Sequence, residues 1–372
     1  MDLIIAGDVV PTSINEVIFK KGLKKEIDKD FYDMWKASDF RIFNLECPII
    51  ENGKPILKYG PNISCSNDCI NGIKDLNPNL VLLGNNHIND YGTEGIDNTI
   101  KKLTKENIPY TGIIENYDDI NRGYIFEKDG LRVGIYNFCD NEFSTATFSK
   151  KGTRGISLIK NYKEIKRLKE LTNYLIVIFH GGKEHYQYQT PKLKEFTELL
   201  VEYGADIVIC QHSHCIGTQY RYKNSVIIFG QGNFIFNDSD NELEEKSLII
   251  NINFTTNNYT IKYIPIKKKS GLIQIDDKKT VEDFNTRSVD IEKENNIYQK
   301  VSEFSKQKLN NYMAILSNKS ILKKIINKFF IKNYYVKLYS TTELTKILNI
   351  IECEAHREIL IEALKNKIER DV

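Results

Sequence analysis

Five of the six histidines lie in three short polar segments, each of which follows an apolar run typical of a buried strand. The segments are GNNHINDYG with His87, HGGKEH with His180 and His185, and QHSH with His212 and His214. Histidines clustered at strand ends, with Asp, Glu and Asn nearby, are typical of a metal centre on an α/β fold. The spacing therefore predicts a metal site that several strands build together.

Two carboxylates occupy comparable positions at strand ends. Asp8 comes after the apolar run 3–6 and a glycine, which permits a tight turn and directs the carboxylate into the crevice. Glu46 follows the run 40–45, and Pro48 stops the strand there, so that the Glu46 carboxylate can bridge two cations. Taken singly, Asp8 is equally compatible with a helix cap or turn, and Glu46 with an ordinary loop carboxylate.

The segment around His87 contains too many amides and glycines to form a core strand. Asn86 can bind a hard divalent cation through its amide oxygen. His87 beside it can act as a ligand, as an acid or as a donor to a phosphate oxygen. We therefore predict a functional loop here rather than a packing element.

His212 and His214 form the most specific local pattern in the chain. Residues i and i+2 of an extended segment point to the same side, so both imidazoles can reach one metal centre. In HGGKEH, the two glycines after His180 allow backbone or ligand to approach closely. His185 is interpreted as a neighbour of the site or as a surface residue.

Oxygen and nitrogen donors together make up the candidate ligand set, with His87 beside it. The candidates are Asp8, Glu46, Asn86, His180, His212 and His214. Mixed donors of this kind suit Mn, Fe or Zn better than Mg or Ca, with one or two ions bound. Two ions about 3.5–4 Å apart activate water and neutralise a phosphoryl group. Cysteine is absent from the set, which argues against a structural zinc site.

The elements that must position these residues alternate between strands and helices. Strands are predicted at 3–6, 40–45, 80–83, 132–138, 174–179, 206–210 and 226–229. One helix should start with Thr190 as N-cap and Pro191 at the first position, and end at Gly204. Two more are predicted at 66–76 and along the stripe that starts after Thr93. This order indicates a layered α/β domain.

The C-terminal part of the chain has a different pattern. Residues 247–254 and 259–266 are half-polar and predict an antiparallel hairpin that closes the domain. The Lys267–Lys269 run is interpreted as a solvated linker, and the Lys- and Glu-rich segment beyond it has helical apolar spacing. We therefore expect a domain at 1–268 and a mainly helical region at 269–372.

The composition is that of a globular protein near electrical neutrality, with 52 basic and 50 acidic residues and a formal charge of +2. This balance predicts no nucleic-acid partner. Seven cysteines at irregular spacings are interpreted as reduced, mostly structural thiols. Neither a signal peptide nor a membrane-spanning segment is recognisable, which predicts a cytoplasmic protein without stable membrane insertion and leaves peripheral membrane association open.

The motifs, in this order, resemble those of the CapA family of capsule or poly-γ-glutamate synthesis proteins. They are Gly-Asp, Asn-Leu-Glu, Asn-Asn-His with Asp-Tyr-Gly, His-Gly-Gly with Glu, Gly-Ala-Asp before His-x-His, and Gly-x-Gly-Asn-Phe. This family is a branch of the calcineurin-like metallophosphatases, and the resemblance covers residues 1 to about 266. It implies a four-layer αββα sandwich with the metal site at strand ends, followed here by a C-terminal helical appendage.

The resemblance also implies roles for individual residues. Asp8 and His214 would bind one metal ion, Asn86, His180 and His212 the other, and Glu46 would bridge them. His87 would hydrogen-bond the scissile phosphate or protonate the leaving group, and Asn85, Glu184 and Asn233 would complete the site. The wider superfamily usually has His where this chain has Val10, and Asp where it has Glu46.

Two functions are compatible with these residues. One is a metal-dependent phosphoesterase that acts on a phosphoester or an anionic polymer during cell-surface polymer synthesis. The other is a non-hydrolytic subunit of a capsule or polyglutamate assembly, with a vestigial or polymer-binding metal site. In the second case the C-terminal helices would dock a protein partner.

Overall fold

The computed structural model describes residues 1–120, 122–236, 241–291, 294–316 and 340–371. These residues form two compact units. The first unit comprises Met1–Ile56 and Asn62–Ile297, and the second comprises Leu57–Pro61 and Tyr298–Val372. Every candidate site residue lies in the first unit.

A seven-stranded sheet contains the N-terminal strand. Its strand order is β17-β16-β15-β1-β2-β5-β6, and β1, β2, β5 and β6 are parallel to one another. The strands are β1 (Asp2–Val9), β2 (Phe40–Leu45), β5 (Leu80–Leu82), β6 (Tyr110–Thr111), β15 (Lys246–Phe254), β16 (Tyr259–Lys269) and β17 (Leu272–Ile275). The last three are antiparallel additions at one edge.

A six-stranded sheet contains the second half of the site. Its order is β13-β14-β12-β11-β9-β8, with a parallel centre and an antiparallel strand at each edge. The strands are β8 (Tyr124–Lys128), β9 (Leu131–Cys139), β11 (Tyr174–His180), β12 (Ile207–Gln211), β13 (Gln219–Tyr222) and β14 (Ser225–Ile228). Two small pairs complete the strands: β3 (Ile49–Ile50) with β4 (Cys65–Ser66), and β7 (Ile113–Ile114) with β10 (Gly152–Thr153).

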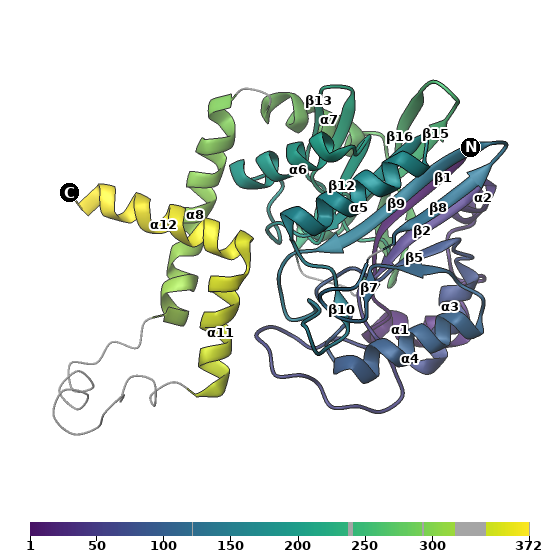
Figure 1. Cartoon of the computed structure of the whole chain (residues 1–372), viewed down its shortest axis with the longest axis horizontal. Helices are drawn as coiled ribbons and strands as arrows, with labels where there is room; N and C mark the ends of the chain where they lie inside the picture. The colour runs from purple at the N-terminus through teal and green to yellow at the C-terminus, as the bar shows by residue number, and fades with distance from the viewer. Residues whose placement is uncertain (121, 237–240, 292–293, 317–339, 372) are drawn as a thin grey trace. The chain divides into compact units, whose positions relative to one another are not determined.

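Three apolar clusters show that the first unit has four layers. One cluster fills the space between the two sheets and includes Leu3, Ile42, Ile176 and Ile209. A second lies between the seven-stranded sheet and the helices α1 (Ser13–Lys21), α2 (Lys29–Ala37), α3 (Ile70–Asp75) and α4 (Gly92–Lys105). A third lies between the six-stranded sheet and α5 (Leu158–Leu171) and α6 (Pro191–Tyr203) (Figure 1). The predicted αββα sandwich is confirmed.

The predicted strands and the 190–204 helix are confirmed. Thr190 caps α6 by accepting a hydrogen bond from the Leu193 N–H, and Gly204 ends the helix with φ 124°. Two helix starts differ from expectation. α4 begins at Gly92, so Thr93 lies inside its first turn. The expected helix at 66–76 begins as a 3₁₀ turn, Asn67–Cys69, before α3.

The lysine run at 267–269 is not a linker, and this prediction is wrong. The three residues end β16, where they pair with β17 and β15. Lys246 and Lys267 lie 3.1 Å and 3.2 Å from the carboxylate oxygens of buried Asp276, so this stretch is fixed by ion pairs as well as by strand pairing. The predicted 247–254 and 259–266 hairpin is confirmed, but β17 and α7 (Lys279–Ile291) follow it within the first unit.

Apart from the Leu57–Pro61 segment, the described part of the second unit is mainly helical. Its helices are α8 (Glu294–Leu316), which begins in the first unit, α11 (Thr341–Glu352) and α12 (Glu354–Asp371). Ser340 begins α11 with a capping box that involves Glu343. Among the described residues, no helix combines the length and hydropathy that a membrane span requires.

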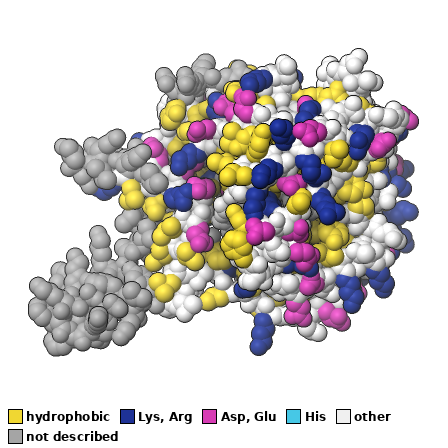
Figure 2. All heavy atoms as spheres, in the orientation of Figure 1, with side chains coloured by type: hydrophobic (Ala, Val, Ile, Leu, Met, Phe, Trp, Pro, Cys, Tyr) yellow, Lys and Arg dark blue, Asp and Glu magenta, His cyan; other side chains and the backbone are white. Residues whose placement is uncertain are grey.

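The cysteines and the surface charges agree with the composition. All seven cysteines lie in the described part of the chain, all are buried, and none forms a disulfide there. On the face that Figure 2 shows, Lys and Arg side chains are interspersed with Asp and Glu. This mixture is what a net charge of +2 leads one to expect.

Strand β1 extends beyond the predicted run, so Asp8 lies inside the strand and not after a turn. The pairing of β1 with β2 is irregular between Ile5 and Asp8. Gly7 is needed there because the Gly232 carbonyl lies where a side chain would start: a Cβ on Gly7 would be 2.0 Å from that oxygen. The glycine therefore serves a close backbone approach and not the expected tight turn.

We expect Gly7→Ala to destabilise the first unit by about 2–3 kcal/mol, because two backbones must separate to admit the methyl group. Thermal unfolding followed by circular dichroism measures this. Gly53→Ala is the matched control, since its Cβ would meet only the Tyr91 ring at 3.3 Å. An unfolding temperature equal to that of the wild type would contradict the close approach.

Candidate metal centre

The candidate ligands meet because the parallel strands of both sheets end on the same side. Asp8 and Asn44 are direct neighbours across β1 and β2, and His180 is paired with Gln211 across β11 and β12. The Gly84–His87 segment follows β5, and His212 follows β12 directly. Carboxyl ends of parallel strands are the usual place for ligands in α/β proteins. Residues from distant parts of the sequence are thereby brought to one centre.

One group of donor atoms is formed by Asp8, Glu46 and His180. Their ligand atoms all lie within 4.8 Å of one another, and all three side chains are buried. The His180 Nε2 atom lies 3.0 Å from Glu46 Oε1 and 3.0 Å from Asn86 Oδ1. Its Nδ1 atom lies 3.7 Å from Asp8 Oδ1. Asn86 is thus in contact with this group through the same imidazole nitrogen.

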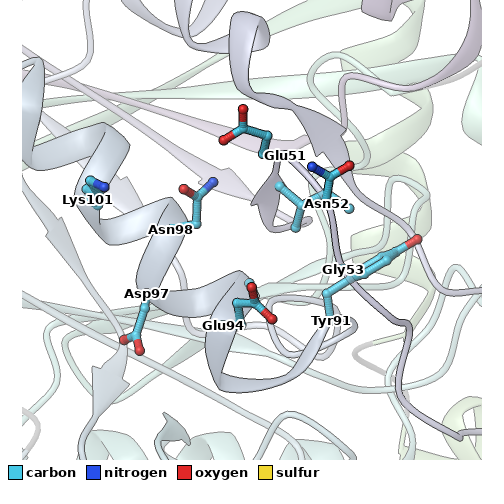
Figure 3. A pocket seen from close by; sticks show the side chains of 10 residues that line it. Glu51, Asn52, Gly53, Tyr91, Glu94, Asp97, Asn98 and Lys101 are labelled. Carbon is cyan, nitrogen blue, oxygen red and sulfur yellow. The ribbon is translucent and has the colours of Figure 1, made fainter.

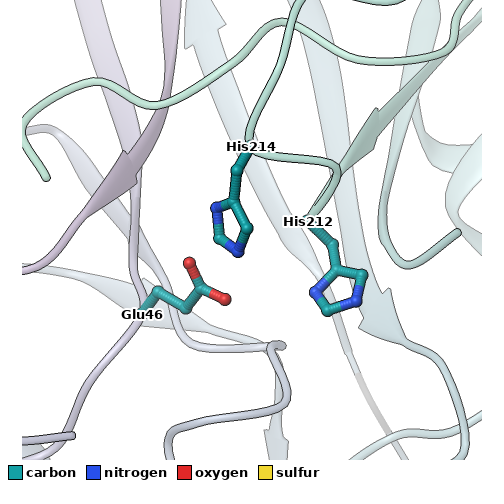
Figure 4. Close-up of side chains that lie close together, drawn as sticks. All are labelled: Glu46, His212 and His214. Carbon is teal, nitrogen blue, oxygen red and sulfur yellow. The ribbon is translucent and has the colours of Figure 1, made fainter. Parts of the chain in front are cut away.

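A second group is formed by Glu46, His212 and His214, again with ligand atoms within 4.8 Å of one another. Figure 4 shows the Glu46 carboxylate pointing toward the space between the two imidazoles. His214 Nδ1 lies 3.7 Å from Asp8 Oδ2, which connects the two groups. Glu46 belongs to both, the position expected of a bridging carboxylate. The implied division into Asp8 with His214, and Asn86 with His180 and His212, cuts across these groups and stays a prediction.

Two buried polar atoms of the centre support a bound cation. Among the described residues, Glu46 Oε2 and His212 Nδ1 have no hydrogen-bond partner. A buried carboxylate oxygen and a buried imidazole nitrogen without partners are costly unless something else engages them. Both are lone-pair donors, so the residues present fit a divalent cation.

The electrostatics of the centre are set by burial. Burial, together with the negative charge of Glu46, raises the pKa of Asp8 to about 6. Burial also opposes ionisation of Glu46, but the charges on His180 and His214 outweigh it and lower the pKa of Glu46 to about 2. For His214 the two carboxylates outweigh burial and raise its pKa to about 9. The raised pKa of His214 reflects the negative charge of the carboxylates beside it.

His212 behaves differently from its neighbours. Burial, reinforced by the positive charges on His180 and His214, lowers the pKa of His212 well below its ordinary value. The imidazole is therefore neutral near pH 7, which is the form that binds metals. Its Nε2 atom lies 3.9 Å from Glu184 Oε1, so an acid is near this ring as well.

The backbone at His212 and His214 is not extended, and the argument from residues i and i+2 of a strand is wrong. Both residues have left-handed φ angles, 85° and 54°. The two rings are nevertheless 5.8 Å apart, because Ser213 between them forms a turn in which its hydroxyl donates to the Cys215 carbonyl at 3.0 Å. Left-handed conformations in residues other than glycine are strained and cluster at functional sites.

Three residues of the loop after β5 have different roles. Asn85 is structural: its amide oxygen accepts from the His87 and Ile88 N–H groups, and its amide NH₂ donates to the Leu45 carbonyl. Asn86 faces His180. The His87 Nδ1 atom lies 2.6 Å from Asp90 Oδ2, and Asp90 is fully buried. The loop therefore presents an oriented imidazole beside the centre.

Three further predictions concern the rim of the centre. Asn233 accepts a hydrogen bond from His214 Nδ1 through Oδ1, at 2.8 Å. Glu184 is half-buried and lies close to His212. The Val10 side chain is fully buried in the apolar cluster between the seven-stranded sheet and its helices, so it supplies no metal ligand.

Asn44 is a residue that the sequence prediction missed. Its amide NH₂ donates to Asp8 Oδ1 at 2.7 Å and lies 3.3 Å from His180 Nδ1, while its oxygen accepts from Asn85 at 3.0 Å. One fully buried amide thus orients two candidate ligands and the loop of a third. A polar residue inside an otherwise apolar strand was the available signal.

Asn137 and Gln211 were also missed, and both join the two sheets. The Asn137 side chain accepts from the Gly84 N–H at 2.7 Å and donates to the Ile178 carbonyl at 3.2 Å. The Gln211 side chain on the six-stranded sheet donates to the Ala6 carbonyl of β1 at 3.2 Å. These bonds fix the two halves of the centre relative to one another.

A separate cavity of about 350 Å³ lies at the first turns of α4 (Figure 3). Its lining includes Glu51, Tyr91, Glu94, Asp97 and Lys101, and none of the candidate ligands. An acidic lining of this kind suits an anionic phosphoester poorly. We therefore place the chemistry at the histidine centre and not in this cavity.

Comparisons with known proteins agree with the motif order. A family model described as "Bacterial capsule synthesis protein PGA_cap" matches residues 2–238. The "Capsule biosynthesis protein CapA" of Bacillus anthracis is 28% identical over 223 residues, which is 58% of this chain and 54% of that protein. The "PGA biosynthesis protein CapA" of Bacillus subtilis (strain 168) is 23% identical over 249 residues, or 65% of each chain. The chain thus spans between half and two thirds of the length of these relatives.

Solved structures show a more distant likeness. A hypothetical protein from Thermus thermophilus matches with a TM-score of 0.47 at 12% identity, over 72% of this chain and 100% of that chain. A 5'-nucleotidase precursor from the same organism matches with a TM-score of 0.40 at 10% identity, over 73% of this chain and 55% of that chain. At this level of similarity, the fold assignment rests on the layers and strand order of the chain itself.

We expect Asn44→Ala to weaken Mn²⁺ binding about 10- to 100-fold, because Asp8 and His180 lose the amide that orients them. Calorimetric titration of the metal-free protein measures this. Asn161→Ala is the matched control, since Asn161 is a buried asparagine on α5 that accepts from the Ser157 N–H and donates to the Tyr136 hydroxyl, away from the centre. Equal losses of Mn²⁺ affinity in the two variants would show that Asn44 affects binding only through the stability of the fold and not by orienting Asp8 and His180.

Proposed function

Because the chain belongs to the bacterial capsule synthesis protein family PGA_cap, we propose that it is a metal-dependent phosphoesterase in the synthesis of capsule, poly-γ-glutamate or another cell-surface polymer. The observation that carries the proposal is the centre itself. Two buried carboxylates and three buried histidines converge there, and two of their lone-pair atoms have no protein partner among the described residues. Packing of an apolar core does not call for such a cluster, whereas metal-assisted phosphoester hydrolysis uses one.

We propose that Asp8, Glu46, Asn86, His180, His212 and His214 hold one or two ions of Mn, Fe or Zn. Bound there, such ions would lower the pKa of a water molecule and neutralise the charge of a phosphoryl group. Glu46 shares donor atoms with both groups and is the candidate bridge. The Asn44 amide keeps Asp8 and His180 in place without reorganisation during the reaction.

His87 is the proposed group that acts directly on the substrate. In the protonated ring, the Asp90 carboxylate accepts from Nδ1–H, and Nε2–H would donate to a phosphoryl oxygen or transfer its proton to the leaving-group oxygen. Asp90 is itself held by the Ile63 N–H, which donates to the same carboxylate at 2.8 Å. Orientation by a buried acid is the arrangement that general acid–base catalysis requires.

We expect the chain loaded with Mn²⁺ to hydrolyse generic phosphomonoesters or phosphodiesters. His87→Ala should lower kcat by about 10²- to 10⁴-fold at unchanged metal content, which is the usual contribution of a positioned proton donor. Asp8→Ala and His212→Ala should lower both rate and metal content. Hydrolysis of p-nitrophenyl esters and elemental analysis provide the measurements.

Glu51→Gln serves as the control, because this carboxylate lines the separate cavity. The phosphoesterase proposal is wrong if Asp8→Ala, His87→Ala and His212→Ala all leave the rate unchanged.

A second candidate function is that of a non-hydrolytic assembly subunit whose metal site binds polymer carboxylates. An apolar stripe on α11 favours it: Leu344, Leu348 and Ile351 are 43%, 47% and 54% exposed at helical spacing. A helix of the second unit with an open apolar face is suited to docking a protein partner. Val10, in place of the usual histidine, also favours it, because one ligand of the wider superfamily is lost.

If this second candidate is right, poly-γ-glutamate should bind the Mn²⁺-loaded chain without being cleaved. Binding should disappear in His212→Ala, because the metal site then lacks a ligand. Calorimetric titration and the length of the recovered polymer measure the two effects. Equal binding with and without Mn²⁺ would contradict a polymer site at the metal centre.

A further inference from the structure

His185 is held in an unusual backbone conformation at the edge of the centre. Its φ angle is 57°, in the left-handed region that costs a residue other than glycine about 1–2 kcal/mol. Its N–H donates to the Ser213 carbonyl at 2.9 Å, so the conformation is fixed by the residue between His212 and His214. A glycine would adopt this conformation without strain, and two glycines already occur in the same segment. The imidazole is therefore the feature that needs an explanation.

A buried acid faces the imidazole of His185. The Nδ1 atom lies 3.4 Å from Glu244 Oε1, and Glu244 is only 7% exposed. Glu244 belongs to a 3₁₀ turn, Glu242–Glu244, and also receives a hydrogen bond from the Asn241 amide at 3.4 Å. The Lys268 ammonium lies 3.9 Å from the other carboxylate oxygen. The acid thus lies on the Nδ1 side of the ring, within ion-pair distance but without a hydrogen bond, and Nε2 lies on the opposite side.

The exposure of the five histidines separates His185 from the candidate ligands. The side chains of His180, His212 and His214 are 0%, 6% and 10% exposed, and that of His87 is 11% exposed. The side chain of His185 is 35% exposed, and its ring centre lies 6.1 Å from that of His214. His185 is therefore the most exposed of these five imidazoles, and its ring lies beside that of His214.

We propose that His185, which lies beside Glu244, is a second substrate-binding imidazole of the centre and donates a hydrogen bond from Nε2 to an oxygen of the bound phosphate group. The proposal rests on the proposed phosphoesterase function and names a residue for it that is distinct from the candidate ligands and from His87. Glu244 is the positioning residue, since it acts on the substrate only through His185. The strained backbone is retained because it places the ring at this edge.

The test uses the full chain loaded with Mn²⁺ and inorganic phosphate as the probe. We expect His185→Ala and His185→Gly to weaken phosphate binding about 10-fold in calorimetric titration, with unchanged Mn²⁺ content. His185→Gly should also unfold at the same or a higher temperature than the wild type, because glycine removes the strain. Glu244→Gln should weaken phosphate binding about threefold, and exposed Glu242→Gln on the same turn should not.

The outcomes separate this proposal from the proposed function. If phosphate binding depends on His185 but the chain hydrolyses no ester, the hydrolytic function is refuted and the phosphate-binding role of His185 is supported. Phosphate affinity that stays within about twofold of the wild type in both His185 variants overturns the proposal, as does a wild type that binds no phosphate. Loss of Mn²⁺ from the His185 variants also overturns it, because His185 would then act as a metal ligand.

Discussion

Two carboxylates, Asp8 and Glu46, are buried side by side in this protein, and the rest of the centre compensates their charge. Each is at most 1% exposed, and both lie within reach of His180. Two like charges out of water are strongly unfavourable unless positive charge lies beside them. Protonated imidazoles can supply that charge, and so can divalent cations. A single constraint thus explains why histidines surround the carboxylates and why a neutral imidazole, His212, is also present.

Such a cluster persists only if the surrounding structure holds it rigidly. Buried amides do this: Asn44 orients Asp8 and His180, Asn137 ties the β5 loop to β11, and Gln211 ties the two sheets together. The Gly232 carbonyl also packs directly against Gly7, which holds the segment around Gly232 against β1. Each of these buried amides bonds to a group on another strand or loop. The hydrogen bonds that hold the centre therefore also hold the two sheets together.

The histidines of the centre differ in exposure, from the buried candidate ligands to the more exposed ring proposed to bind substrate. His180, His212 and His214 are buried among the carboxylates, His87 is held by a buried aspartate, and His185 lies beside a buried glutamate and is partly exposed. This order suits a centre that binds cations deep inside and an anionic group toward the surface. It is in keeping with membership of a family of capsule synthesis proteins and with the proposed phosphoester or anionic polymer as substrate.

Apolar runs and polar strand ends are local features, so the sequence alone predicted the main strands, a layered α/β domain and a set of candidate ligands, whereas the four-layer arrangement came from the family resemblance. The sequence did not reveal Asn44, Asn137 or Glu244, whose partners lie on other strands and far along the chain. The reason it suggested for His212 and His214 was wrong, since left-handed φ angles depend on a turn that local spacing cannot show. Lys267–Lys269 looked like a linker because ion pairs with Asp276 and pairing with β17 form only in the folded chain. The sequence specifies the residue types and the local elements, but tertiary packing determines which distant residues come into contact.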